Sequence, residues 1–198
     1  MILNINMSYT ELSKTITKNL NKDEKKSNGI YFTSQEIIKK TIKMLGKRRF
    51  KRILEPCYGS GEFIKELSNK YKKSRIEGIE MNEMMTGLCE KNEDMKGENI
   101  ELKRGDYLKT DFEEVYDLII GNPPFYVMKR GDVEKDYLKY IEGRPNIFVL
   151  FILKSLSLLK KRGILSFVLP SSFKNCLYYN KLRELIDKTC EIIGIEDN

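Results

Sequence analysis

The feature that most constrains the fold of this chain is an apolar run that ends at two consecutive prolines. Residues 115–120 have the composition of a buried strand, and Gly121-Asn122-Pro123-Pro124-Phe125 follows directly. Proline fixes φ and has no N–H to donate, so two in succession end a strand and leave a stiff backbone corner. Open α/β sheets bind their ligands at the carboxyl ends of their strands, so this corner is a candidate site.

The chemistry of the corner suits an exocyclic amine on a flat heterocycle. The Asn122 side-chain oxygen and the Pro123 carbonyl can each accept one amine hydrogen, and the Phe125 ring can cover the heterocycle. The alternative is a strand followed by an ordinary proline-rich turn. The neighbouring segments favour the functional interpretation.

A glycine-rich turn lies upstream of the corner. Residues 52–54 lead into Glu55-Pro56-Cys57-Tyr58-Gly59-Ser60-Gly61-Glu62-Phe63, and apolar residues then recur at helical spacing. Glycine lets the backbone approach a ligand closely, and the helix amino terminus comes next. The segment lacks the Gly-Lys-Ser/Thr ending of a phosphate-binding P-loop.

Two further predicted strands end in carboxylates. Residues 75–80 end at Glu80, about 20 residues beyond the turn, the separation at which an acidic residue typically reaches a ribose diol. Residues 99–103 precede Asp106, which could accept a hydrogen bond from an adenine amino group, while Tyr107 or Leu108 could pack on the base. The first two features alone suit a dinucleotide as well as any other ribose-bearing cofactor.

In this order, the motifs at 55–63, 78–80, 105–107 and 122–125 resemble those of S-adenosylmethionine-dependent adenine-N6 DNA methyltransferases. The resemblance is to the gamma arrangement, in which the cofactor motifs precede the catalytic one. Residues 31–36, before an amphipathic helix, are similar to the segment that packs over the methionine part of the cofactor. Residues 145–148 and 163–173 resemble the fifth-strand region, so the resemblance spans roughly residues 29–198.

The resemblance implies an α/β, Rossmann-like class I methyltransferase fold, with a mostly parallel twisted sheet and helices on both faces. It implies a methyl transfer from S-adenosylmethionine to the N6 amino group of an adenine flipped out of duplex DNA, of restriction-modification type. The catalytic residues it implies are Asn122, Pro123, Pro124 and Phe125. The cofactor-binding residues it implies are Tyr31, Thr33, Glu55, Pro56, Cys57, Gly59, Gly61, Phe63, Glu80, Met81, Asp106, Tyr107 and Asn122.

Several alternatives remain open at this point. An RNA adenine-N6 methyltransferase would share every residue named, and a protein glutamine methyltransferase also presents an amide to an Asn-Pro-Pro-aromatic corner. A nicotinamide-dependent dehydrogenase accounts for the glycines and Glu80 but leaves residues 122–124 without a role. A decayed cofactor fold serving as a binding subunit is the non-enzymatic alternative.

Composition narrows the chemistry and the location. The 198 residues contain no histidine, which excludes Ser-His-Asp hydrolysis, and the four cysteines have no metal-ligand spacing, so no metal site is expected. Neither a signal peptide nor a membrane span is evident, so we expect a cytoplasmic, intracellular protein without membrane contact.

The net charge of +7, from 36 basic against 29 acidic residues, favours a polyanionic partner such as DNA. The basic clusters at 47–52, 72–73 and 160–162 precede strands, so they are interpreted mainly as solubility and helix carboxyl-end charges. Lys129 and Arg130, just beyond the corner, are the expected phosphate contacts.

The expected organisation is a polar amino-terminal extension, 1–28, with a short helix near 9–20, and a catalytic domain, 29–198, with an insertion loop at 126–145. A helix at 176–188 and a final strand at 191–195 are predicted. The resemblance implies a further antiparallel strand, a second stacking ring and a DNA-recognition domain beyond these. A recognition subunit or a missing carboxyl-terminal domain is therefore an expected partner.

Overall fold

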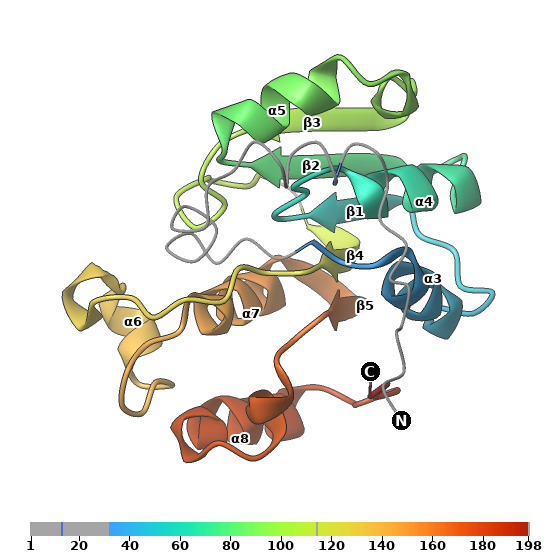
Figure 1. The fold of residues 1–198 in the computed structure, drawn as a ribbon. Helices are drawn as coiled ribbons and strands as arrows, with labels where there is room; N and C mark the ends of the chain where they lie inside the picture. The colour runs from blue at the N-terminus through green and yellow to red at the C-terminus, as the bar shows by residue number, and fades with distance from the viewer. Residues whose placement is uncertain (1–12, 14–31, 114, 198) are drawn as a thin grey trace, which may run out of the picture.

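The protein is described from a computed structural model, which describes Ser13 and residues 32–113 and 115–197 (Figure 1). One five-stranded sheet forms its centre, in the order β3-β2-β1-β4-β5, and every pairing is parallel. The strands are β1 (Arg52–Glu55), β2 (Arg75–Glu80), β3 (Ile100–Arg104), β4 (Tyr116–Gly121) and β5 (Leu159–Phe167). The strand order reverses between β1 and β4, which is where such sheets bind ligands.

Helices cover both faces of the sheet, which confirms the predicted Rossmann-like α/β class. Within residues 32–113 and 115–197, the α-helices are α3 (Gln35–Met44), α4 (Glu62–Lys70), α5 (Glu83–Glu90), α6 (Lys135–Leu138), α7 (Ile147–Leu158) and α8 (Asn180–Thr189). Short 3-10 helices are η1 (Glu93–Met95), η2 (Arg130–Asp132), η3 (Ser171–Lys174) and η4 (Leu177–Tyr179).

Side-chain caps start three of the α-helices. The side chains of Ser34, Asn82 and Asn146 accept backbone N–H groups in the first turns of α3, α5 and α7. A polar cap satisfies a donor that has no partner within the helix. These caps fix where each helix begins, and those of α3 and α5 lie next to segments that the sequence predicts to bind the cofactor.

Alternating strand residues divide the core between the two faces. Ile53, Ile76 and Leu118 pack with the apolar faces of α3 and α4, whereas Leu54 and Ile119 pack with α7. The first seven residues of α7, Ile147–Leu153, are all buried because the helix packs against the sheet and also against α8, for example through Leu182. In Figure 1, α8 lies beyond α7 at the β5 end of the molecule.

The carboxyl-terminal segment differs from the sequence prediction. The predicted helix at 176–188 is η4 followed by α8, and the predicted strand at 191–195 is wrong, because residues 191–197 form no ladder with any described strand. The segment instead runs past α3, where Glu196 lies 3.8 Å from Lys40. A strand requires a paired edge, and without one its apolar side chains stay exposed, including Ile195 at 64%.

The insertion at 126–145 is closed at its base. The Met128 N–H donates to the Pro145 carbonyl (2.9 Å), and the Ile147 N–H donates to the Tyr126 carbonyl (3.0 Å). The loop contains η2 and α6, and its own Val133 and Ile141 side chains are buried. Compact loops whose ends meet and whose own side chains pack inside them are frequently functional.

Two sequence expectations fall largely outside the described residues. The amino-terminal extension and the helix near 9–20 are described only at Ser13, which is helical and buried. Within the described part of the chain, no helix has the length and apolar character needed to cross a bilayer.

Candidate active site

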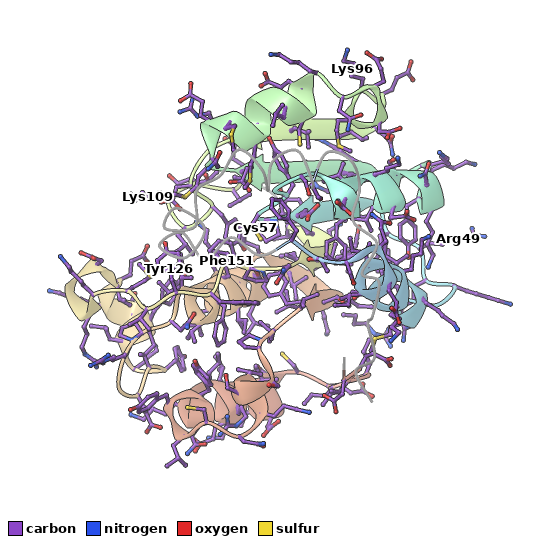
Figure 2. All side chains as sticks on the ribbon, in the orientation of Figure 1. Arg49, Cys57, Lys96, Lys109, Tyr126 and Phe151 are labelled. Atoms are coloured by element: carbon purple, nitrogen blue, oxygen red, sulfur yellow. The ribbon has the colours of Figure 1, made fainter. Side chains whose placement is uncertain are left out.

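The carboxyl ends of β1 and β4 meet at the point where the strand order reverses. β1 continues into the glycine-rich turn and β4 continues into the Asn122 corner, which lie side by side. The Cys57 thiol donates to the Asn122 backbone carbonyl across 3.3 Å. Figure 2 labels Cys57 near the centre of the molecule, with Lys109 and Tyr126 toward the same end of the sheet. One hydrogen bond therefore joins the two motifs.

The Cys57 thiol is a structural donor. Burial raises its pKa well above the usual value, and the nearby carboxylates of Glu55 and Glu80 raise it further. A thiol with a raised pKa stays protonated at neutral pH and is a poor nucleophile. Its position suits a role in holding the corner.

The glycine-rich turn needs glycine at both positions. Gly59 has φ 53° and Gly61 has φ 76°, in the left-handed region that disfavours side chains. A Cβ at Gly61 would meet the Met95 sulfur at 2.7 Å, whereas a Cβ at Gly59 would meet nothing within 4 Å. The space above Gly59 is therefore open for a ligand.

Glu80 is held at the end of β2 by two backbone donors. The Gly59 N–H donates to Oε2 (2.9 Å) and the Asn82 N–H donates to Oε1 (2.8 Å). Burial raises the carboxyl pKa, and these N–H groups oppose that effect. A carboxylate oxygen accepts more than one hydrogen bond, so both oxygens can still receive a diol. The adjacent Met81 is 62% exposed and offers an apolar surface there.

Glu55 is the most unusual group in the site. Its side chain is buried at the end of β1, and its Oε2 atom has no hydrogen-bond partner among the described residues. Burial raises its pKa well above the usual value, and Glu80 raises it further. A buried acceptor without a donor is destabilising, so a ligand carrying N–H groups would satisfy it.

Asp106 follows β3 in a tight turn that lies next to Glu80. The Gly105 N–H donates to the Glu80 carbonyl (3.0 Å), which ties the ends of β3 and β2 together. The Asp106 Oδ1 atom accepts the Leu108 N–H (3.0 Å), and its Oδ2 atom lies 3.4 Å from the Lys109 ammonium. Asp106 stays partly exposed beside the cofactor candidates.

Tyr107, Phe63 and Pro56, all from the predicted cofactor-binding set, are buried. Tyr107 is buried against Phe151, and its hydroxyl pairs with Ser155 Oγ (2.9 Å). Phe63 is buried with the α3 and α4 core, and Pro56 is buried at the end of β1. Of the two candidates for packing on a base, Leu108 is the partly exposed one, because Tyr107 is part of the core.

Lys154 is a residue that the sequence analysis missed. It extends from α7 and donates to the carbonyls of Leu108 (2.9 Å) and Thr110 (2.7 Å). Its ammonium lies 5.4 Å from the ring centroids of both Tyr107 and Phe112. Burial lowers its pKa. The only sequence signal was a single lysine in an apolar helix, and in the structure it fastens the Asp106 turn.

The corner that the sequence predicts to be catalytic is partly enclosed. The Asn122 side-chain oxygen is buried, Pro123 is buried, and Pro124 and Phe125 are half-buried. The Phe125 ring meets the Phe148 ring edge-on, with centroids 6.1 Å apart. This contact holds the Phe125 ring against α7. In the chain, Phe125 comes shortly after Asn122 and Pro123, whose oxygens are the two predicted amine acceptors.

The segment before α3 approaches the glycine-rich turn. Thr33 is half-buried, and Tyr31 lies outside the described residues. Gln35 donates to the Glu62 carboxylate at the start of α4, and Ser13 contacts both Glu62 and Ser60. No group of acidic or thiol side chains in the described part of the chain has metal-binding geometry.

Comparison with protein families matches residues 4–197 to the family described as Eco57I restriction-modification methylase. The chain is 32% identical over 194 residues to Modification methylase CviBIII of Paramecium bursaria Chlorella virus NC1A, covering 95% of this chain and 49% of that protein. It is 29% identical over 188 residues to Type II methyltransferase M.AccI of Acinetobacter calcoaceticus, covering 90% and 34%. The chain thus spans half or less of these relatives.

Solved structures share the fold. A protein from Listeria monocytogenes described as a class I S-adenosylmethionine-dependent methyltransferase superimposes with TM-score 0.69 at 17% identity, covering 89% of this chain and 56% of that one. A precorrin-6y C5,15-methyltransferase from Geobacter metallireducens gives TM-score 0.55 at 17% identity, covering 79% and 72%. At these identities the similarity concerns the fold alone.

Proposed function

This chain belongs to the Eco57I restriction-modification methylase family, and we propose that it transfers a methyl group from S-adenosylmethionine to the N6 amino group of adenine in DNA. The observation that carries the proposal is the Cys57–Asn122 hydrogen bond. This bond links the Asn122 corner, which carries the two proposed amine acceptors, to the glycine-rich turn, which suits a ribose-bearing cofactor.

The glycine-rich turn and the neighbouring strand ends fit S-adenosylmethionine. Glu80 can accept the ribose hydroxyls, and Asp106 can accept the adenine amino group. One buried Glu55 oxygen accepts no hydrogen bond from any described residue, and the ammonium of the methionine part would supply a donor. The open space above Gly59 lets the ligand approach the backbone. When bound, this cofactor supplies an electrophilic methyl group on a positively charged sulfur.

The corner provides the activation that an aromatic amine needs. Its nitrogen lone pair is delocalised into the ring, so the amine is a poor nucleophile. The Asn122 side-chain oxygen and the Pro123 carbonyl accept the two amine hydrogens, which favours electron density on nitrogen as positive charge develops. Both acceptors belong to a rigid strand end, so little reorganisation accompanies the reaction.

Phe125 supplies a stacking face for the flipped base. Extruding a base from a duplex costs a few kcal/mol, and stacking on one aromatic ring returns about 1–3 kcal/mol. Because Phe125 alone barely offsets that cost, we propose that a further stacking group and sequence recognition come from a carboxyl-terminal domain or a separate recognition subunit. The relatives, of which this chain spans half or less, support this division.

RNA adenine and protein glutamine are the alternative substrates. The names of the relatives, a modification methylase and a type II methyltransferase, favour DNA. A DNA substrate is also consistent with the intracellular location expected from the sequence.

The test is methyl incorporation from labelled S-adenosylmethionine into duplex DNA, RNA and protein extract, with nucleoside analysis of the product. We expect N6-methyladenine in DNA, produced by the chain together with its recognition partner and lost in Asn122→Ala. Label confined to RNA or to glutamine would contradict the proposal and identify the substrate.

A further inference from the structure

A basic cleft lies at the amino-terminal end of the sheet, opposite the corner. Its volume is about 280 Å³, and four basic side chains line it: Arg48, Arg49, Lys161 and Arg162. Figure 2 shows Arg49 at the far side of the sheet from Lys109 and Tyr126. The sequence predicts solubility and helix-end charges here, but the structure gathers them from two distant segments around one hollow.

The cleft depends on an irregularity in β5. Tyr116 pairs with Leu159 and Leu118 pairs with Ile164, so residues 160–163 bulge outward opposite a single β4 residue. Bulges re-aim side chains and are common beside functional sites. Here the bulge presents Lys161 and Arg162 toward the loop that carries Arg48 and Arg49.

Arg162 has a strained backbone. Its φ is 67°, and it is the one non-glycine residue with positive φ in the described part of the chain. This conformation costs on the order of 1 kcal/mol or more for a residue with a Cβ, and Gly163 is the next residue. Strain of this kind clusters at functional sites, where the side chain is needed in place.

The positive charge of the cleft is not neutralised locally. Among the described residues, Arg49, Lys161 and Arg162 form no ion pair. The one acidic side chain lining the cleft is Asp117, whose Oδ2 atom accepts the N–H groups of Lys51 and Arg52 (2.8 Å each). Its Oδ1 atom pairs with Lys160 (3.1 Å).

We propose that this cleft binds the phosphate backbone of nucleic acid at a site separate from the one that receives the target base. Arginine and lysine side chains that converge on a hollow neutralise phosphates and release counterions. The cleft lies at the opposite end of the strands from the corner, so it contacts a different stretch of the polymer. The choice of DNA as that polymer rests on the proposed function.

The experiment measures binding of a labelled short DNA duplex by fluorescence anisotropy across a salt series, without cofactor. The test variant is Arg49→Gln/Lys161→Gln/Arg162→Asn, in which asparagine tolerates the left-handed backbone. The control, Lys39→Gln/Lys91→Gln/Lys188→Gln, removes the same charge from exposed lysines elsewhere. Thermal melting checks that both variants fold, and we expect the test variant to be at least as stable as the parent.

We expect the test variant to bind the duplex at least about tenfold more weakly at low salt. The slope of log affinity against log salt concentration should become shallower by about two to three, because each lost phosphate contact removes about 0.9 from it. The control variant should change this slope by less than the loss of one phosphate contact would, which is about 0.9. Equal effects of both variants would show that only net charge matters, and an unchanged test variant would exclude the cleft; either result overturns the proposal. Displacement of the duplex by polyglutamate as readily as by unlabelled duplex also contradicts it.

Failure of this site and failure of the proposed function are distinguishable. Asn122→Ala should retain the parent's DNA affinity and salt slope while losing methyl transfer. A parent chain that binds DNA through the cleft but methylates only RNA or protein would contradict the proposed substrate while leaving the phosphate site in place.

Discussion

The Cys57 thiol and the Asn122 carbonyl, 65 residues apart in the chain, are joined by a 3.3 Å hydrogen bond. This contact connects the end of β1 to the end of β4 at the point where the strand order reverses. The residues that we propose to bind the cofactor and to accept the amine hydrogens therefore follow rigid strand ends, which hold reacting groups more accurately than mobile loops do.

Substitutions at Asn122 and at Glu80 should have different effects, the first on methyl transfer and the second on cofactor binding. Asn122→Ala removes an amine acceptor, so methyl transfer should fall by about 100-fold or more while cofactor affinity changes little. Glu80→Ala removes charge-assisted hydrogen bonds worth about 1.5–3 kcal/mol, so the cofactor should dissociate about tenfold more readily. Calorimetric titration with S-adenosylmethionine and a methylation assay measure the two effects. Equal loss of cofactor binding in both variants would mean that the site is assigned wrongly.

The Cys57 thiol should affect methyl transfer through the hydrogen bond that it donates to the Asn122 carbonyl. Cys57→Ala removes a hydrogen bond worth about 0.5–1.5 kcal/mol and should slow methyl transfer more than it weakens cofactor binding, whereas Cys57→Ser should restore part of the rate. The comparison needs kcat and KM for each variant. Equal rates for alanine and serine would show that the thiol only fills space.

Alkylation should distinguish the cysteines. Burial, Glu55 and Glu80 raise the pKa of Cys57, and burial raises the pKa of Cys89 to about 12, so both should react slowly near neutral pH. The exposed Cys190 should react first and serves as the internal reference. Peptide mapping by mass spectrometry after a timed iodoacetamide treatment gives the order; modification of Cys57 ahead of Cys190 would contradict the assigned protonation.

Glu55 should destabilise the cofactor-free protein at neutral pH. Its folded-state pKa is raised, so the folded state binds more protons than the unfolded state, and stability falls as pH rises from the unfolded value near 4.3 through the folded pKa. Glu55→Gln should therefore raise Tm at neutral pH, and the gain should shrink as pH falls toward about 4.

The same Glu55→Gln substitution should weaken S-adenosylmethionine binding, because the ligand's ammonium loses its carboxylate. Melting curves across a pH series, with and without cofactor, measure both effects. A variant with a lower Tm at neutral pH would show that the buried carboxylate is stabilising in the free protein.

Lys154 should act by positioning the Asp106 turn. Lys154→Met keeps the length of the side chain but leaves the Leu108 and Thr110 carbonyls without their donor, at a cost of about 1–3 kcal/mol. We expect a higher KM for the cofactor with little change in kcat. Lys181→Met, at an exposed site on α8, is the matched control. A fall in kcat at unchanged KM would place Lys154 in a different role.

Much of the site could be predicted from the sequence because its elements are local. The apolar run before two prolines, the left-handed glycines and the acidic ends of the strands each depend on a few neighbouring residues. The structure places Glu80, Gly59 and Asn122 at one end of the sheet as those signals indicated. The role of each residue in binding and transfer stays a prediction.

Long-range packing decided what the sequence could not. Tyr107 packs in the core because its ring contacts Phe151 and its hydroxyl pairs with Ser155 Oγ. The Lys154 side chain extends from the apolar helix α7 and donates to two carbonyls more than forty residues away in the chain. Residues 191–195 have the composition of a strand but form none, because a strand needs a partner edge.

The sequence by itself determined strands β1 to β4, the corner and the glycine turn, since φ restrictions, missing donors and the two-residue period act within a few residues. Only the tertiary structure decided that Cys57 bonds to Asn122, that one Glu55 oxygen has no partner in the described part of the chain, and that Arg49 and Arg162 line one cleft. Those relationships arise from the register of β4 against β1 and β5, which brings distant segments together and which no local pattern encodes.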